Sequence, residues 1–345
     1  MKKLVVASTG KSAGKTSLIV GLAQVMGGSS GYVKPIGDRL LYRKKRLWDH
    51  DAALFAQMWK MEAKPEDITI GFEHGKLRYM YDRSATEAKV QEMIQAVGGD
   101  RDTAFVEAGV NLAFGSSVHL DAISLAKFAD APLVLVLGGG EASVLDEIHF
   151  YKNYINDEGA RLAGFVINRV ADLEDFEATY REELDQTGLP ILGIIPRSEE
   201  LETLPVRFLV ERLFARVVAG EDGINNVVKH IFLGAMSVSS AVGHPSFEKS
   251  NKLIITSGDR SDMILAAIAS GTSCIVLTNN LLPPGNILAK ASEAKVPVLL
   301  VPWDTFTTVQ KIEQVEALLT IEDKPKMDIV CELVKKHVNI EAIFG

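Results

Sequence analysis

The sequence predicts an α/β protein built on a doubly wound, mostly parallel sheet and followed by a smaller α/β domain, and three observations predict it. Short apolar runs alternate with amphipathic segments along most of the 345 residues. This alternation is typical of βαβ units, in which helical crossovers make neighbouring strands parallel. A loop rich in glycine and small residues, at 8–17, joins the first apolar run to the first helical segment. Glycine or polar residues also follow several apolar runs, where open α/β sheets bind ligands.

The predicted elements of the first domain alternate in the order that this architecture requires. Apolar runs predict strands at 2–7, 31–36, 103–107, 133–137, 162–167 and 191–195. Amphipathic segments predict helices at 18–26, 49–61, 122–129 and 145–155. The residues at or near the strand ends, where we expect the ligand site, are Gly10, Lys34, Glu107, Gly138, Asn168 and Pro196.

After a helix predicted at 206–218, the alternation of predicted strands and helices is interrupted. A polar segment with glycines follows at 219–223, and we place the domain boundary there. In the second domain we expect strands at 253–256, 274–278 and 298–301, and helices at 262–269, 286–294 and 306–318. A last helix is expected at 328–336, with its attachment left open. The predicted domains are therefore 1–218 and 219–325, with a C-terminal helical tail at 326–345.

Composition and charge favour a cytoplasmic protein without nucleic-acid or membrane partners. The formal net charge is −8, which argues against a broad nucleic-acid surface. The basic run at 43–46 is either a solvated loop or a clamp for a phosphate or a substrate. Cys274 and Cys331 have no CxxC partner, which argues against a cysteine metal site or a disulfide framework and suits a reducing compartment. No apolar stretch approaches the roughly 20 residues of a membrane-spanning helix, and the first strand begins too early to leave room for a signal peptide.

The loop at 8–17 has the pattern of a phosphate-binding P-loop. It reads Ser-Thr-Gly-Lys-Ser-Ala-Gly-Lys-Thr-Ser between a strand and a helix. Small residues let the backbone curl so that successive N–H groups point at an anion, and the helix N-terminus adds partial positive charge. We expect Lys15 to neutralise the β- and γ-phosphates and the Thr16 hydroxyl to bind Mg²⁺. The loop departs from the general pattern at Thr9, where a glycine is usual.

Carboxylates near the strand ends are candidate metal ligands. Glu107, at the end of its strand, could contact Mg²⁺ directly or through water. Asp51 is either a second ligand or a helix-start carboxylate that the helix dipole favours. Asp38 and Asp49 are weaker candidates of the same kind.

Lys34 and Asn168 each leave two interpretations. Lys34 lies at the carboxyl end of a predicted strand and is either exposed and idle or directed at an anion beside the phosphates. Asn168 could bind the edge of a purine, because its amide offers a donor and an acceptor together. Alternatively, it ends its strand at a turn.

Six short motifs in order make most of residues 1–205 resemble dethiobiotin synthetase, an ATP- and Mg²⁺-dependent enzyme of the P-loop superfamily. They lie at 9–16, 31–36, 51–52, 106–109, 162–168 and 192–196. In that family the P-loop carries a threonine at the position of Thr9, so the departure at this residue is a family trait. The resemblance implies a P-loop NTPase fold with ATP and Mg²⁺ as cofactors. Because relatives often pair, it also implies a homodimer.

The resemblance assigns roles to individual residues. The implied metal ligands are Thr16, Asp51 and Glu107, and the implied catalytic lysines are Lys15 and Lys34. Asn168 would face adenine. The expected nucleotide-binding residues are Thr9, Gly10, Lys11, Ser12, Ala13, Gly14, Lys15, Thr16, Ser17, Asn168 and Pro196.

The chain departs from this family where the organic substrate would lie. Lys11 stands in place of a threonine, and Val110 and Asn111 replace a glycine pair after Glu107. The loop at 112–117 also differs. We therefore expect ATP·Mg²⁺ binding, while the departures argue against carboxylation of diaminopelargonate.

The second domain resembles the DRTGG domain, named for its motif. That motif falls at 258–262, after a predicted strand and before a predicted helix, where Asp259 and Arg260 match and Ser261 replaces threonine. A stretch at 304–308 matches a later part of the family. The resemblance implies a sensing or interacting domain that takes a small metabolite or a protein partner. Alternatively, Asp259 and Ser261 merely cap the helix.

The two domains together resemble the non-catalytic N-terminal region of long phosphate acetyltransferases, so we expect no acetyltransferase activity from these residues alone. We favour a regulatory nucleotide-binding protein with slow ATP hydrolysis. The alternative is an ATP-dependent ligase or carboxylase that phosphorylates a carboxylate or carbamate. A transport or partitioning ATPase is disfavoured because its additional loop lysine would fall at Gly10.

Overall fold

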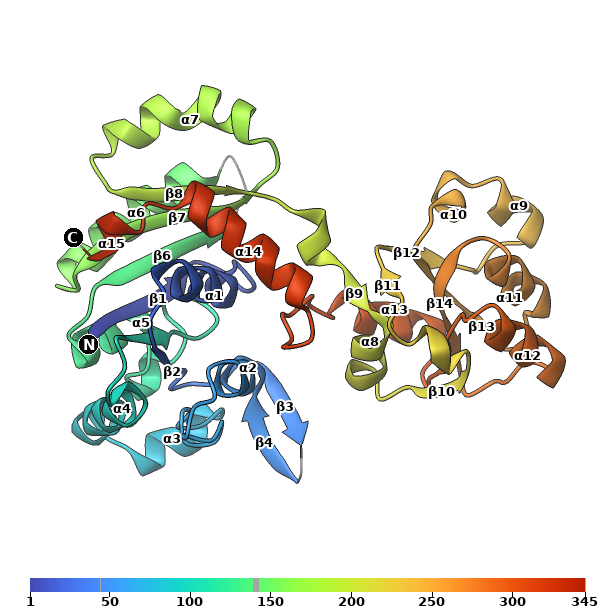
Figure 1. Ribbon diagram of the computed structural model, residues 1–345, viewed down its shortest axis with the longest axis horizontal. Coiled ribbons are helices and arrows are strands. Elements are labelled where there is room, and N and C mark those ends of the chain that lie inside the picture. Colours follow the sequence, from blue (N-terminus) through green and yellow to red (C-terminus); the bar gives the residue numbers. More distant parts are fainter. Residues whose placement is uncertain (44, 139–142, 345) are drawn as a thin grey trace. The chain divides into compact units, whose positions relative to one another are not determined.

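The chain forms two compact units in the computed structural model, which describes residues 1–43, 45–138 and 143–344 (Figure 1). The first unit contains Met1–Ser198 and Leu319–Gly345, and the second contains Glu199–Leu318. Each unit has its own larger sheet. The chain therefore leaves the first unit once and returns to it near the C-terminus.

The first unit is built on a six-stranded sheet in the order β2-β5-β1-β6-β7-β8. Each neighbouring pair is parallel. The strands are β1 (Lys2–Ser8), β2 (Ser30–Val33), β5 (Thr103–Glu107), β6 (Leu133–Gly138), β7 (Leu162–Val170) and β8 (Ile191–Pro196). The residues of β2 and β5 are all buried, which explains why the middle of β5, Ala104 to Val106, is a continuous apolar run. The predicted parallel α/β sheet is confirmed.

The strands that follow β1 along the chain are added first on one side of β1 and then on the other side. From β1 the chain goes outward to β2, returns through β5 and then crosses to β6 on the other side. Right-handed crossovers in opposite directions place α1 and α5 on opposite faces. The reversal puts a topological switch point at the carboxyl end of β1, where such sheets bind ligands. The helices are α1 (Lys15–Met26), α2 (His50–Met58), α3 (His74–Met80), α4 (Arg83–Gly98), α5 (Ala122–Ala129), α6 (Ser143–Asp157), α7 (Leu173–Gln186), α14 (Lys324–His337) and α15 (Glu341–Phe344).

Helix α14, the second-last helix of the chain, packs along α1 and belongs to the first unit (Figure 1). Gly21 lies at this contact, where a Cβ would come within 2.4 Å of Val334 Cγ2 and 3.2 Å of the Val330 carbonyl oxygen. The two helices approach closely because this residue has no side chain. Just after α14, Val338 forms a β-bridge with Gly193 of β8. The helix that the sequence left unattached is thus joined to both α1 and the sheet edge.

Replacing Gly21 with alanine is expected to destabilise the first unit. The added methyl group would overpack the contact with Val334, which costs about 1–3 kcal/mol. The gain in helix propensity, roughly 1 kcal/mol, offsets part of this cost. Chemical denaturation followed by circular dichroism measures the change. The matched control is Gly75→Ala in α3, where a Cβ would meet nothing within 4 Å, and an equal loss in both variants would contradict the packing argument.

The second unit contains a five-stranded sheet in the order β10-β15-β14-β13-β12. Its strands are β10 (Arg216–Ala219), β12 (His230–Leu233), β13 (Lys252–Ser257), β14 (Thr272–Thr278) and β15 (Val298–Leu300). Strands β12 to β15 pair in parallel, and β10 is the antiparallel edge strand. The helices are α8 (Val206–Arg212), α9 (Val238–Val242), α10 (Pro245–Glu248), α11 (Ser261–Ile268), α12 (Gly285–Glu293) and α13 (Thr305–Glu313). The predicted smaller α/β domain is therefore present.

The helix predicted at 206–218 is wrong in its second half. Helix α8 ends at Arg212, and Arg216–Ala219 form β10, which pairs with β15. Val206 and Leu209 of α8 are buried in the same core as Leu253. These contacts place α8 and β10 in the second unit, which begins at Glu199 rather than at residue 219. Local polarity at 219–223 marked a turn inside this unit.

Candidate nucleotide-binding site

The loop between β1 and α1 curls over the end of the sheet. Gly14, immediately before α1, has φ +110°, and Ser12 has φ +55°. A Cβ at Gly14 would lie 2.1 Å from Nδ2 of Asn168. Asn168, near the carboxyl end of β7, donates a hydrogen bond of 2.7 Å to the Ala13 carbonyl. The loop is therefore held by an amide from a neighbouring strand, and this contact requires glycine at position 14.

Lys15 begins α1 and is almost completely buried, with 4% of its surface exposed. Its Nζ donates a hydrogen bond of 2.9 Å to Ser8 Oγ. Burial lowers the pKa of Lys15, although the carboxylate of Glu107 acts in the opposite direction. The ammonium group thus lies against the loop at the end of β1, where a P-loop lysine is expected.

Glu107 ends β5 beside the P-loop strand and is fully buried. Its Oε1 accepts a hydrogen bond of 3.2 Å from the Thr16 hydroxyl, and its Oε2 accepts one of 3.0 Å from the Tyr32 hydroxyl. Burial raises the pKa of Glu107 to about 7, while the cation of Lys34 opposes the shift. Two of the predicted metal ligands, Thr16 and Glu107, therefore meet directly.

Lys34 lies at the centre of a buried cluster of carboxylates. Its Nζ is 2.5 Å from Asp38 Oδ1, 2.6 Å from Asp51 Oδ2, 3.3 Å from Asp49 Oδ1 and 3.9 Å from Glu107 Oε1. Burial alone would lower the pKa of Lys34, but these carboxylates raise it well above its usual value. Of the two interpretations from the sequence, exposed and idle is wrong, because the side chain is fully buried.

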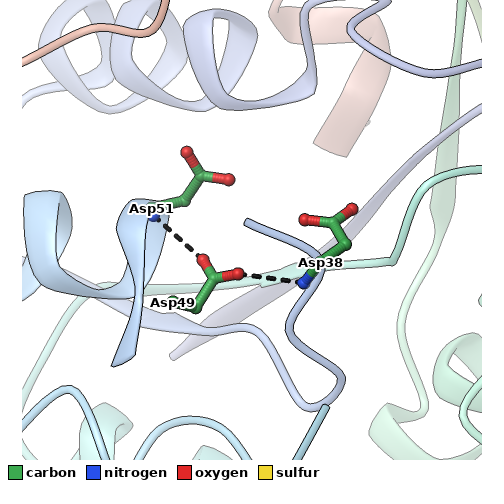
Figure 2. Close-up of side chains that lie close together, drawn as sticks. All are labelled: Asp38, Asp49 and Asp51. Atoms are coloured by element: carbon green, nitrogen blue, oxygen red, sulfur yellow. Dashed lines mark hydrogen bonds between the residues drawn. The ribbon is translucent and has the colours of Figure 1, made fainter. Parts of the chain in front are cut away.

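Asp49 organises the start of α2, and Figure 2 shows its two hydrogen bonds to neighbouring aspartates. Its Oδ1 caps the helix by accepting from the backbone N–H groups of Asp51 and Ala52. Its Oδ2 accepts from the backbone N–H groups of Asp38 and Arg39, each at 3.1 Å. Oxygen atoms of Asp38, Asp49 and Asp51 lie within 4.8 Å of one another. Asp49 therefore brings the segment after β2 to the start of α2.

Arg39, which was not among the residues predicted from the sequence, lies between the P-loop and α2. Its Nη1 donates to Asp51 Oδ2 at 2.9 Å and to Thr16 Oγ1 at 3.2 Å, and its Nη2 is 3.4 Å from Ser12 Oγ. Burial alone would raise the pKa of Asp51, but Lys34 and Arg39 hold it well below its usual range. The available signal was position, because Arg39 directly follows the candidate Asp38.

The predicted metal ligands fit a hard divalent cation. Thr16, Asp51 and Glu107 offer hydroxyl and carboxylate oxygens, the donors that Mg²⁺ prefers. The pair Thr16 Oγ1 and Asp51 Oδ2 already accommodates a cationic group, the guanidinium of Arg39. The site is therefore shaped for positive charge between these two oxygens.

The loop that differs from the dethiobiotin-synthetase pattern is folded against α3. A Cβ at Gly109 would lie 2.2 Å from the Phe114 ring, and the Phe114 ring packs edge-on against His74 with 4.8 Å between centroids. Asn111 Oδ1 accepts a hydrogen bond from the Ala113 N–H. Asn111 and Phe114 are therefore both in contact with residues of the first unit, namely Ala113 for Asn111, and Gly109 and His74 for Phe114.

The remaining predicted residues lie at strand ends, on the loop or in a hairpin. Pro196 ends β8, next to β7, and Gly138 ends β6. Lys11 is exposed on the loop. Lys44 of the basic run lies outside the described residues, as do Gly139 and Gly140, which follow Gly138 in the sequence. Lys45 and Arg46 lie at the end of the hairpin formed by β3 (Leu40–Arg43) and β4 (Arg46–Asp49).

The motif of the second unit makes contacts that the capping interpretation does not predict. The N-cap of α11 is Arg260, with no side-chain capping bond, so the alternative that Asp259 and Ser261 cap this helix is wrong. Arg260 donates to the Met236 carbonyl at 2.9 Å and to Asp262. At 304–308, by contrast, Asp304 caps α13 by accepting from the Thr307 N–H at 2.7 Å.

Among the helices described, none has both the length and the apolar character that crossing a bilayer requires.

A parallel sheet with a lysine- and threonine-containing loop at its switch point defines a P-loop protein of the nucleotide-binding class. The chain belongs to the family described as "AAA domain", whose model matches residues 2–204, and the model of the "DRTGG domain" matches residues 208–315. The DRTGG resemblance drawn from the sequence is thereby confirmed, and the match over residues 2–204 supports a nucleotide-binding P-loop domain.

Phosphate acetyltransferases are among the curated relatives. The chain is 24% identical to the phosphate acetyltransferase of Pseudomonas aeruginosa, over 99% of this chain and 51% of that protein. It is 30% identical to the phosphate acetyltransferase of Synechocystis sp., over 64% of this chain and 33% of that protein. The chain therefore spans about half or less of the length of these relatives. Among solved structures, cobyrinic acid a,c-diamide synthase from Mycobacterium smegmatis matches with a TM-score of 0.35 and 16% identity, over 58% of this chain and 87% of that chain.

Proposed function

We propose that this protein is a regulatory nucleotide-binding protein that holds ATP and Mg²⁺ in its first domain. The observation that carries the proposal is the convergence of Lys15, Thr16, Asp51 and Glu107 around one end of the sheet. Lys15 would neutralise the β- and γ-phosphates, and Thr16, Asp51 and Glu107 would hold the metal. The bound Mg²⁺ would neutralise phosphate charge.

The regulatory part of the proposal rests on two features. The loop at 110–117 differs from the dethiobiotin-synthetase pattern where an organic substrate would lie, and Phe114 of this loop packs over Gly109. A DRTGG domain follows the nucleotide-binding domain. Nucleotide occupancy would change how the DRTGG domain engages a small metabolite or a protein partner. We further propose slow ATP hydrolysis, a homodimer and a cytoplasmic location.

Replacing Lys15 with alanine tests nucleotide binding. Loss of a charged hydrogen-bond donor is worth about 1.5–3 kcal/mol, so ATP affinity is expected to fall by about ten- to a hundredfold. Isothermal titration calorimetry with ATP and Mg²⁺ measures the affinity. The control is Lys76→Ala in α3, whose side chain is 72% exposed and paired with Glu73. No heat signal from the unmodified protein at millimolar ATP would refute the proposal.

The second candidate function is an ATP-dependent ligase that activates a carboxylate or carbamate. The burial of Lys34 beside Asp51 and Glu107 favours it, because a positioned cation there could stabilise charge that develops on the reacting anion. Release of ADP and phosphate, measured with and without bicarbonate and small carboxylates, separates the two functions. A slow, substrate-independent rate supports the regulator, and a rate that one carboxylate stimulates strongly supports the ligase.

A further inference from the structure

The guanidinium of Arg39 lies between two of the oxygens expected to bind the metal. Nη1 is 2.9 Å from Asp51 Oδ2 and 3.2 Å from Thr16 Oγ1. Both oxygens belong to the predicted metal-ligand set. A divalent cation at this position would bind the same lone pairs of Thr16 Oγ1 and Asp51 Oδ2 that now accept hydrogen bonds from Arg39 Nη1. The cation and the guanidinium therefore compete for these two oxygens, and their like charges repel each other.

The backbone of Arg39 is fixed, while its side chain reaches toward the P-loop. The Arg39 N–H donates to Asp49 Oδ2 at 3.1 Å, and its carbonyl accepts from the His50 N–H at 2.8 Å. Nη2 lies 3.4 Å from Ser12 Oγ of the loop. The side chain is 15% exposed, whereas that of Lys34 is fully buried. A rotamer change at Arg39 can thus move the guanidinium without moving α2.

A guanidinium displaced from Asp51 would have an anion beside it. A triphosphate in the loop would bring its oxygens close to Ser12, and guanidinium groups match phosphate oxygens through paired hydrogen bonds. Exchanging a carboxylate for a phosphate keeps the cation paired. Lys34 would remain among Asp38, Asp49 and Asp51 during this exchange.

We propose that Arg39 is a resident counter-ion that occupies the metal position in the absence of nucleotide and moves onto the terminal phosphates when Mg²⁺ and nucleotide bind. This proposal rests on the nucleotide-binding function proposed above. Under this proposal, metal and nucleotide bind cooperatively. A bound nucleotide gives Arg39 a new partner, and Arg39 then leaves the oxygens that bind the metal.

Metal binding to the full-length protein without nucleotide provides the test. The probe is Mn²⁺ alone, titrated and followed by electron paramagnetic resonance. Arg39→Gln is expected to bind Mn²⁺ about tenfold more tightly than the unmodified protein. Arg39→Lys, which keeps the charge, should lie close to the unmodified protein. Arg101→Gln is the matched control, because Arg101 donates to the Ser30 carbonyl elsewhere in the first unit.

The second arm measures ATP affinity with metal removed by a chelator. Arg39→Gln is expected to bind metal-free ATP about tenfold more weakly and to lose most of the cooperativity between Mn²⁺ and ATP. Unchanged or weaker Mn²⁺ binding in Arg39→Gln, or no Mn²⁺ binding to either protein at millimolar concentration, would overturn the counter-ion proposal. Failure of the unmodified protein to bind ATP under any condition would instead remove the proposed function, while the Mn²⁺ arm would still test the competition.

Discussion

Replacing Lys34 with methionine is expected to destabilise the first unit by about 3–5 kcal/mol, the cost of breaking a buried ion pair from one side. The side chain of Lys34 is fully buried, and carboxylate oxygens of Asp38, Asp51 and Asp49 lie within 3.3 Å of its Nζ. Without the ammonium these carboxylates repel one another at a site where Asp49 and Asp51 are almost completely buried. Thermal and chemical denaturation of the full-length protein would measure the loss.

A second buried lysine supplies the control. Lys252 of β13 is also fully buried, but it contacts the carbonyls of Lys249 and Ser270 and the ring of Phe247. Burial lowers the pKa of Lys252, whereas that of Lys34 is raised by its carboxylates. Lys252→Met leaves carbonyls rather than charges unpaired, so its cost is expected to be nearer 1–3 kcal/mol, roughly the value for buried neutral groups. Equal losses would argue against electrostatic repulsion as the cause.

A compensating variant makes the interpretation sharper. Adding Asp38→Asn to Lys34→Met removes one carboxylate from the cluster and should recover part of the lost stability. Additive losses would contradict the model of mutual repulsion. Removing Lys34 is expected to change folding and binding together. Lys15, and not Lys34, is therefore the better position for testing nucleotide affinity.

Replacing Gly14 with alanine is expected to weaken ATP binding by at least about tenfold. The φ of +110° is strained for any residue with a Cβ, at a cost of about 1–3 kcal/mol. The new methyl group would also lie 2.1 Å from Asn168 Nδ2, so the loop or the asparagine must move. Either movement redirects the backbone N–H groups that would bind the phosphates. Calorimetry with ATP and Mg²⁺ measures the effect.

Gly10 in the same loop is the matched control. A Cβ at Gly10 would meet nothing within 4 Å, so Gly10→Ala should cost much less affinity. The double variant Gly14→Ala with Asn168→Ala removes the clash but keeps the backbone strain, so it should recover part of the affinity. If Gly10→Ala and Gly14→Ala bind ATP equally well, the loop geometry described above is not what nucleotide binding requires.

Much of the first domain could be predicted because its signals are local. Runs of mostly apolar residues predicted β1, β5, β6, β7 and β8, since strands that are buried on both faces are rich in apolar residues. Strand β2 was predicted from a shorter run around Tyr32 and Val33. Helices α4 and α7 were missed, and their sequences have fewer apolar residues because one face of each is exposed. The antiparallel strand β10 was taken for helix because four residues carry little periodicity.

Most residues of the candidate site could also be predicted from local signals, whereas their roles could not be tested by the structure. Lys15, Thr16, Lys34, Asp51 and Glu107 were predicted from motifs and strand ends, and the structure brings their side chains together. Their assigned roles toward ATP and Mg²⁺ remain predictions. Asn168 was predicted to face adenine, and the structure adds a hydrogen bond from its amide to the P-loop. Its role toward adenine also stays a prediction.

The sequence by itself determined the parallel α/β class and the phosphate-binding loop, because both depend on residues that are neighbours in the chain. Only the tertiary structure decided that Lys34 is enclosed by carboxylates, that Arg39 lies between Thr16 and Asp51, and that α14 packs on α1. The physical reason is that charge pairing and helix packing depend on which distant segments meet in space. A local pattern can identify a charged residue, but its partners are set by the fold.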